Sequence, residues 1–291
     1  MDNLAFQSFV ILRDLFFDDC GKPVLFNLRE KRNTQDDPFD EYIASALDEQ
    51  LQNVGARCQK ASGPLISPDM VVYKQGINMS DTSTQNNPSH VVGVEVKKLE
   101  RGKTGKIARA TGLDFNTTPP CGKIRIYTES DAELVVKGYY LFACLELNED
   151  GLYYVSAMSL CDGSILNDDF DLYTEITGSR EKEINLGTYG DGANRNRPML
   201  IFSNPLGAKI LDHKITLISE LALSTGLGNI DLAWHFVRVD INNNRHQFYV
   251  YMDKRDIKPD HIVEEIVEPF PQPKKRIEQT QSRGKFKLTI R

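Results

Sequence analysis

Asp69, Glu95 and Lys97 lie in two short apolar segments of this chain. Asp69 follows a proline, and a single valine separates Glu95 from Lys97. Acids are unusual in segments whose neighbours have the composition of buried strands. Two carboxylates can hold Mg²⁺, which activates a water and stabilises charge developing on a phosphate. A lysine beside them can orient that water or stabilise the transition state. These residue types therefore predict hydrolysis of a phosphodiester.

Strand geometry brings the three side chains together. Side chains alternate between faces, so Glu95 and Lys97 share one face and the valines at 92, 94 and 96 pack on the other. Asp69 is expected to begin the neighbouring strand, and the polar stretch 74–90 suits the connection of a hairpin. Asp69 and Glu95 then converge at one end of it. The alternative is that Glu95 and Lys97 form an ordinary solvated pair on a strand.

A helix is predicted over about 38–54, with Asp37 as N-cap and Pro38 in the first turn. Its apolar face comprises Phe39, Tyr42, Ile43, Ala46, Leu47, Leu51 and Val54. Asp40 lies at the edge of this face. Two interpretations remain open: Asp40 is a further metal or water ligand, or it favours the helix N-terminus through the dipole.

The order of these features resembles the PD-(D/E)XK nuclease superfamily, and within it the type II restriction endonucleases. The resemblance covers about 38–145 and is carried by Asp40, Pro68-Asp69 and Glu95-Val96-Lys97. It implies an α/β fold with a mixed central β-sheet flanked by helices. It also implies Mg²⁺ as cofactor, double-stranded DNA as substrate, catalytic roles for Asp69, Glu95 and Lys97, and metal ligation by Asp69, Glu95 and Asp40.

Site-specific cleavage of a palindromic target would call for a C2 homodimer, because two identical active sites must face antiparallel strands. Two alternatives stay open. One is a repair or recombination nuclease that recognises DNA structure, and the other is a non-catalytic DNA-binding module on the same fold.

Length and composition fit one large domain. The chain has 291 residues, of which 40% are hydrophobic and 26% charged. We expect a nuclease domain over 1–265, a DNA-recognition elaboration over about 150–260, and a proline-linked basic tail over 266–291. No long apolar run, signal peptide, P-loop or GxGxxG motif is present, so we expect a cytoplasmic protein without membrane or nucleotide cofactor. Five scattered cysteines suggest reduced thiols rather than a zinc site.

A net charge of −6 argues mildly against a DNA partner, but the basic residues are clustered. The run at 97–109 starts at the proposed site, and phosphate contacts are expected from Lys98, Arg101, Lys103, Lys106 and Arg109. The alternative is an ordinary solvated face. In the following loop, Asn116, Thr117 and Thr118 either grip phosphates and base edges or only shape turns.

Further DNA contacts are expected in the second half. The loop 191–197 carries Asn194, Arg195, Asn196 and Arg197, whose types match adenine and guanine edges in the major groove but are also ordinary in loops. The tail 274–291 has seven basic residues and one acid. It would lie along DNA, pair with an acidic patch of another subunit, or form a disordered end. We also expect helices at 6–17 and 211–224. Strands are expected at 123–127, 138–147, 152–160, 199–202, 235–241 and 247–252.

Overall fold

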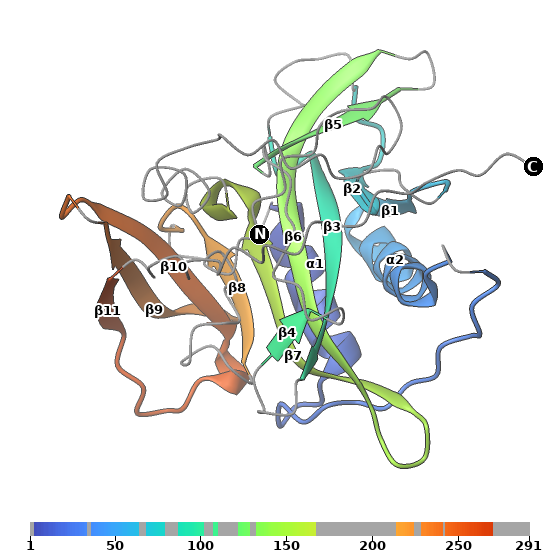
Figure 1. Cartoon of the computed structure of the whole chain (residues 1–291). Coiled ribbons are helices and arrows are strands. Elements are labelled where there is room, and N and C mark those ends of the chain that lie inside the picture. The colour runs from blue at the N-terminus through green and yellow to red at the C-terminus, as the bar shows by residue number, and fades with distance from the viewer. Residues whose placement is uncertain are drawn as a thin grey trace, which may run out of the picture.

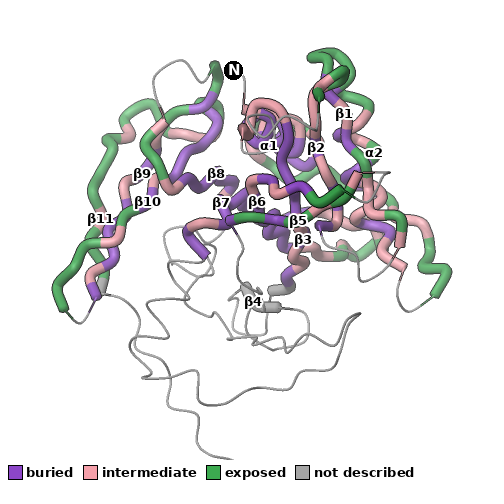
Figure 2. Tube along the Cα trace, turned by 90° about the horizontal axis from the view of Figure 1, so that it is seen from above, coloured by how far each residue is buried: buried purple, intermediate pink, exposed green. Residues whose placement is uncertain are grey.

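The computed structural model describes residues 3–33, 36–63, 68–78, 87–101, 107–109, 122–128, 132–166, 214–223, 228–240 and 242–269. Within these residues, eleven strands form one mixed sheet, accompanied by two long α-helices and by a short helical segment at 163–166 (Figure 1). The expected α/β class with a large mixed sheet is therefore confirmed. Both helices lie on the same face of the central strands, as Figure 2 shows, rather than on either side of the sheet.

The strands follow one another across the sheet in the order β1-β2-β3-β6-β7-β8-β10-β9-β11, with β4 beside β3 and β5 beside β6. They are β1 (Ala56–Lys60), β2 (Met70–Lys74), β3 (Val91–Arg101), β4 (Ile107–Arg109), β5 (Lys123–Tyr127), β6 (Glu133–Leu147), β7 (Tyr153–Asp162), β8 (Ile215–Ser219), β9 (Ile230–Val239), β10 (Arg245–Asp253) and β11 (Glu264–Pro269). Neighbours are antiparallel except for the pairs β3 and β6, β7 and β8, and β9 and β11.

Helix α1 (Leu4–Phe16) matches the expected core helix, and α2 (Pro38–Leu51) continues into the 3-10 turn η1 (Gln52–Val54). A second 3-10 turn, η4 (Lys254–Asp256), follows β10. The Asp37 side chain accepts a hydrogen bond from the Phe39 N–H at 3.1 Å, which confirms it as N-cap. Val54 is 51% exposed, so its assignment to the apolar face was wrong: the α-helix ends before it.

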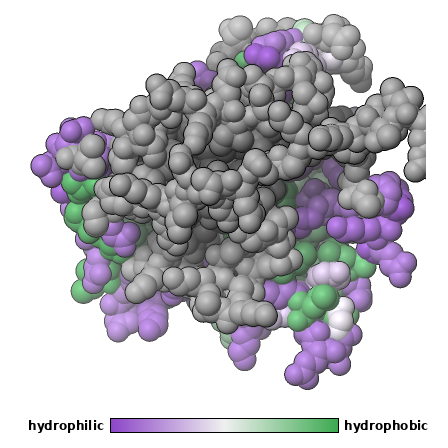
Figure 3. Space-filling model, viewed as in Figure 1, coloured by the Kyte–Doolittle hydropathy of each residue, from purple (hydrophilic) through white to green (hydrophobic). Residues whose placement is uncertain are grey.

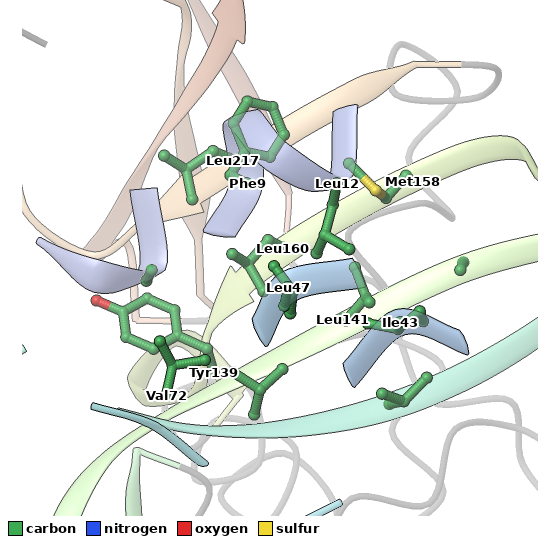
Figure 4. Close-up of a cluster of buried hydrophobic side chains, with 14 of the residues drawn as sticks. Phe9, Leu12, Ile43, Leu47, Val72, Tyr139, Leu141, Met158, Leu160 and Leu217 are labelled. Atoms are coloured by element: carbon green, nitrogen blue, oxygen red, sulfur yellow. The ribbon is translucent and has the colours of Figure 1, made fainter. Parts of the chain in front are cut away.

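The main core lies between the two helices and the central strands. Figure 4 shows part of this core and labels Phe9, Leu12, Ile43, Leu47, Val72, Tyr139, Leu141, Met158, Leu160 and Leu217. A second buried cluster, which includes Phe142, Phe236 and Val250, lies on other strand positions and extends to β9 and β10. Full burial of one such large side chain is worth about 1.5–3 kcal/mol. The packing of α1 and α2 against the central strands forms the layer that supports the candidate site.

The helix expected at 211–224 is wrong, because residues 215–219 form strand β8. All five residues of β8 are buried, and it lies between β7 and β10. A short apolar run buried on both faces has no alternation, so its periodicity does not separate strand from helix. Strands β9 and β10 confirm the pair expected at 235–241 and 247–252, although β9 begins earlier.

Strands β1, β4 and β11 were not predicted. Strand β11 pairs with β9 through Pro269, so the first residues of the segment assigned to the tail belong to the sheet. The strand expected at 199–202 and the tail 274–291 lie outside the described residues. The cysteines at 20, 58, 144 and 161 are free thiols, and Cys121 is not described.

On the face shown in Figure 3, the described residues lie around the edge, and polar and apolar side chains are interspersed among them. Individual large apolar residues are exposed, among them Leu221 and Ile262, as is normal for globular proteins. None of the described helices has the length and apolar composition that crossing a lipid bilayer would require.

Candidate functional site

The candidate site begins where β2 and β3 separate. The last paired residues at this end of the ladder are Met70 and Val94, so Asp69 lies one position beyond, next to Glu95. The Asp69 Oδ2 accepts a hydrogen bond from the Val96 N–H at 2.7 Å. The Asp69 carboxylate thus accepts the hydrogen bond of a β3 backbone N–H at the point where the pairing of β2 with β3 stops. Asp69 and Glu95 therefore lie side by side at one end of the β2–β3 hairpin, as expected.

Glu95 and Lys97 point to the same face of β3, and the Lys97 Nζ donates to the Glu95 Oε1 at 2.7 Å. Their side chains are only 17% and 21% exposed. The pair is therefore shielded from solvent, unlike a typical surface pair. Tyr140 on β6 is the register partner of Glu95, and its ring centroid lies 5.7 Å from the Lys97 Nζ. The ring and the carboxylate together hold the ammonium in place.

Asp40 reaches the same site from the first turn of α2. Burial raises the pKa of Asp40 to about 7, and the negative charges of Asp69 and Glu95 act in the same direction. Burial likewise raises the pKa of Asp69 to about 6, followed by the charge of Glu95; Lys97 and the Val96 N–H oppose this. These mutual effects place the three carboxyl groups and the Lys97 ammonium within electrostatic reach of one another.

Lys60, at the end of β1, was not predicted. Its positive charge opposes the rise in pKa of both Asp40 and Asp69. The Ala61 N–H donates to the Asp69 backbone oxygen at 2.9 Å, which fixes the end of β1 beside the site. The signal for Lys60 in the sequence was weak, because β1 itself is a short strand with only two buried side chains.

A divalent cation fits part of this arrangement. Asp40 Oδ1 is buried and has no hydrogen-bond partner, and the two aspartates have raised pKa values. Both observations indicate that the charge of these carboxylates is not fully neutralised by neighbouring groups, as a bound cation would do. Among the described residues, no group of three or more His, Cys, Asp and Glu side chains is arranged to hold a metal ion. Mg²⁺ usually takes one or two carboxylates and completes its shell with water and substrate phosphates. Asp69 together with either Glu95 or Asp40 supplies the two carboxylates that such a Mg²⁺ site needs.

Lys98 points to the opposite face of β3 from Lys97. It forms an ion pair with Asp37 at the start of α2, while burial, and secondly the charge of Lys31, lower its pKa to about 8. A DNA contact by Lys98 stays a prediction. Arg101 and Arg109 lie on the paired strands β3 and β4, and nothing is described of their side chains. The other proposed DNA contacts lie outside the described residues: Lys103, Lys106, Asn116, Thr117, Thr118, Asn194, Arg195, Asn196 and Arg197.

A cavity of about 400 Å³ lies elsewhere, lined by Trp234, Met252 and His261 among others. It shares no lining residue with the site at the end of β2 and β3. Asp256 on its wall is already bound by the buried guanidinium of Arg13. The cavity therefore adds nothing to the candidate chemistry.

The chain was also compared with known proteins. No family model, curated protein or solved structure matches it.

Proposed function

We propose that this protein is a Mg²⁺-dependent endonuclease that hydrolyses phosphodiester bonds of double-stranded DNA. The observation that carries the proposal is the convergence of Asp69, Glu95 and Lys97 where two strands separate, with Asp40 buried beside them. Carboxylates with raised pKa values grouped around a lysine are typical of sites that bind a metal and a phosphate. A purely structural ion pair would not require Asp40 to be buried beside it with an Oδ1 that has no hydrogen-bond partner.

Each side chain has a separate role in this proposal. Asp69 and Glu95 would hold Mg²⁺, and Asp40 would be an auxiliary ligand through its unpartnered Oδ1. The bound ion supplies a Lewis acid and an activated water. Lys97 is held by Glu95 and Tyr140 so that its ammonium faces the site, where it orients the water or stabilises the negative charge of the transition state.

Within this class we propose a type II restriction endonuclease that acts as a homodimer on a short target. The support is the order of the helix acid, Pro-Asp and Glu-x-Lys along the chain, which resembles those enzymes. A structure-specific repair or recombination nuclease is the second candidate, since the same catalytic set serves both. A non-catalytic binding module is less well supported, because such a module would not need to retain the buried acids and the lysine.

The experiment is a digestion of plasmid and phage DNA with Mg²⁺ or with EDTA. Discrete fragments that appear only with Mg²⁺ would support site-specific cleavage. A smear would indicate a non-specific nuclease, and cleavage confined to branched or gapped DNA would indicate the structure-specific alternative. Uncut DNA of altered mobility would indicate a binding module. No effect on any DNA would contradict the proposal.

A further inference from the structure

Lys60 is the last residue of β1, at the open end of the β1–β2–β3 edge. Its register partner is Met70, the residue after Asp69. Alternation along β1 puts Lys60 on the same face as the buried Ala56 and Cys58, and α2 packs against this strand. Asp40 belongs to α2, so Lys60 lies on the face of β1 against which the helix that carries Asp40 packs.

The two lysines differ in how they are bound. The Lys97 ammonium is held by Glu95 at 2.7 Å and lies over the Tyr140 ring. Among the described residues, the Lys60 ammonium has neither a hydrogen bond nor an ion pair within 4.0 Å, although its charge acts on Asp40 and Asp69. A lysine that only neutralised these acids would be expected to contact one of them. Lys60 is instead half-buried, acts electrostatically on the acids, and has no side-chain partner in the part of the chain that the structure describes.

We propose that Lys60 is a phosphate-binding residue of the active site, and that it contacts a non-bridging phosphate oxygen of the nucleic-acid strand placed between α2 and the end of β2. This inference rests on the proposed nuclease function and adds a second cation to it. A phosphate held next to metal-bound carboxylates brings more negative charge into a site that already contains three acids. One lysine committed to Glu95 cannot balance this charge alone, and a second, unpaired ammonium does so.

The chain provides a matched control in Lys74. Lys74 ends β2 at the opposite end of the same two-strand ladder, where it is paired with Ala56. Both lysines terminate a strand, both are half-buried, and neither side-chain ammonium makes a hydrogen bond or ion pair among the described residues. They differ in distance from the site: four residues of strand, roughly 13 Å, separate the two ends.

The test compares Lys60→Met, Lys60→Arg and Lys74→Met with the unchanged protein, using plasmid DNA with Mg²⁺ and a labelled duplex in EDTA. Lys60→Met should lower the cleavage rate roughly 10- to 100-fold, as expected for a lost hydrogen bond to a charged group. It should also reduce the slope of log affinity against log salt by about 0.9, one phosphate contact. Lys60→Arg should restore most of both, and Lys74→Met should change neither.

Several results would overturn the inference. If the unchanged protein cuts DNA and Lys60→Met matches it in rate and salt slope, Lys60 binds no phosphate and the proposed function still stands. Equal losses in Lys60→Met and Lys74→Met would show a general effect of net charge. If the unchanged protein neither cuts nor binds DNA, the proposed function fails and this inference fails with it. Circular dichroism and thermal unfolding establish that each variant is folded.

Discussion

The Asp69 carboxylate accepts a hydrogen bond from the backbone N–H of Val96 at 2.7 Å, one step beyond the last β2–β3 residue pair. A side chain thus bonds a strand N–H at the point where the two backbones separate. The hydrogen bond fixes the Asp69 carboxylate beside Glu95.

Replacing Asp69, Glu95 or Lys97 tests their assignment to catalysis. We expect Asp69→Asn, Glu95→Gln and Lys97→Met each to lower the cleavage rate at least about 100-fold, the effect typical of removing one group that stabilises transition-state charge. DNA binding and the folded state should persist. The measurement is the single-turnover rate on plasmid DNA, with the exposed Asp231→Asn as control. Near-normal rates in all three variants would remove these residues from the chemistry.

The buried Asp40 makes the metal-free protein less stable at high pH. Its folded-state pKa is about 7, above the ordinary 3.8, so the folded state binds the proton more tightly than the unfolded state. Stability is therefore lost as pH rises through about 4 to 7. At pH 8 we expect Asp40→Asn to be more stable than the unchanged protein by on the order of 2–4 kcal/mol.

Urea unfolding in EDTA at pH 4.5, 6 and 8 measures this difference. The stability gap between the two proteins should widen with pH, and the raised pKa of Asp69 adds a similar trend to both of them. A gap that is constant across the series would mean that Asp40 is not a buried acid with a raised pKa.

Mg²⁺ should stabilise the folded protein at pH 8, because binding to the folded state alone shifts the unfolding equilibrium. At a concentration 100 times the dissociation constant, the gain is about 2.7 kcal/mol. We expect a higher unfolding midpoint with Mg²⁺, reversal by excess EDTA, and a much smaller gain in Asp69→Asn. Asp231→Asn should respond like the unchanged protein. Identical gains in all proteins would place the ion somewhere else.

Arg13 connects α1 to the C-terminal strands. Its guanidinium is fully buried and binds Asp256 through two hydrogen bonds, Nε to Oδ2 at 3.0 Å and Nη2 to Oδ1 at 2.7 Å. Arg13→Met should destabilise the protein by about 3–5 kcal/mol, because it leaves the Asp256 charge buried without its partner. Arg13→Met combined with Asp256→Asn should recover part of this loss. Equal destabilisation in the single and double variants would show that packing, not charge, dominates.

The sequence was sufficient for features governed by local rules. Asp37 and Pro38 marked the start of α2, and the alternation of valines with Glu95 and Lys97 gave the two faces of β3. The register that places Asp69 beside Glu95 followed from a hairpin with a polar connection. The first two features are decided by residues close along the chain, and the third by a single hairpin connection.

Features that depend on distant contacts could not be predicted. Residues 215–219 form a strand because β7 and β10 lie on either side of them, which no local pattern reveals. Lys60 joins the site only because β1 pairs with β2 at the sheet edge. Tyr140 was recognised as part of a core strand, but its position beside Lys97 depends on the parallel pairing of β3 with β6.

The central claim is that the acids and lysine at the end of β2 and β3 hydrolyse DNA with a divalent ion. The most direct measurement is digestion of supercoiled plasmid at pH 8 by the unchanged protein and by Asp69→Asn, each with Mg²⁺ and with EDTA. We expect cut products for the unchanged protein with Mg²⁺ and intact plasmid in the other three reactions. Intact plasmid in all four reactions, or equal cutting by Asp69→Asn, would contradict the central claim.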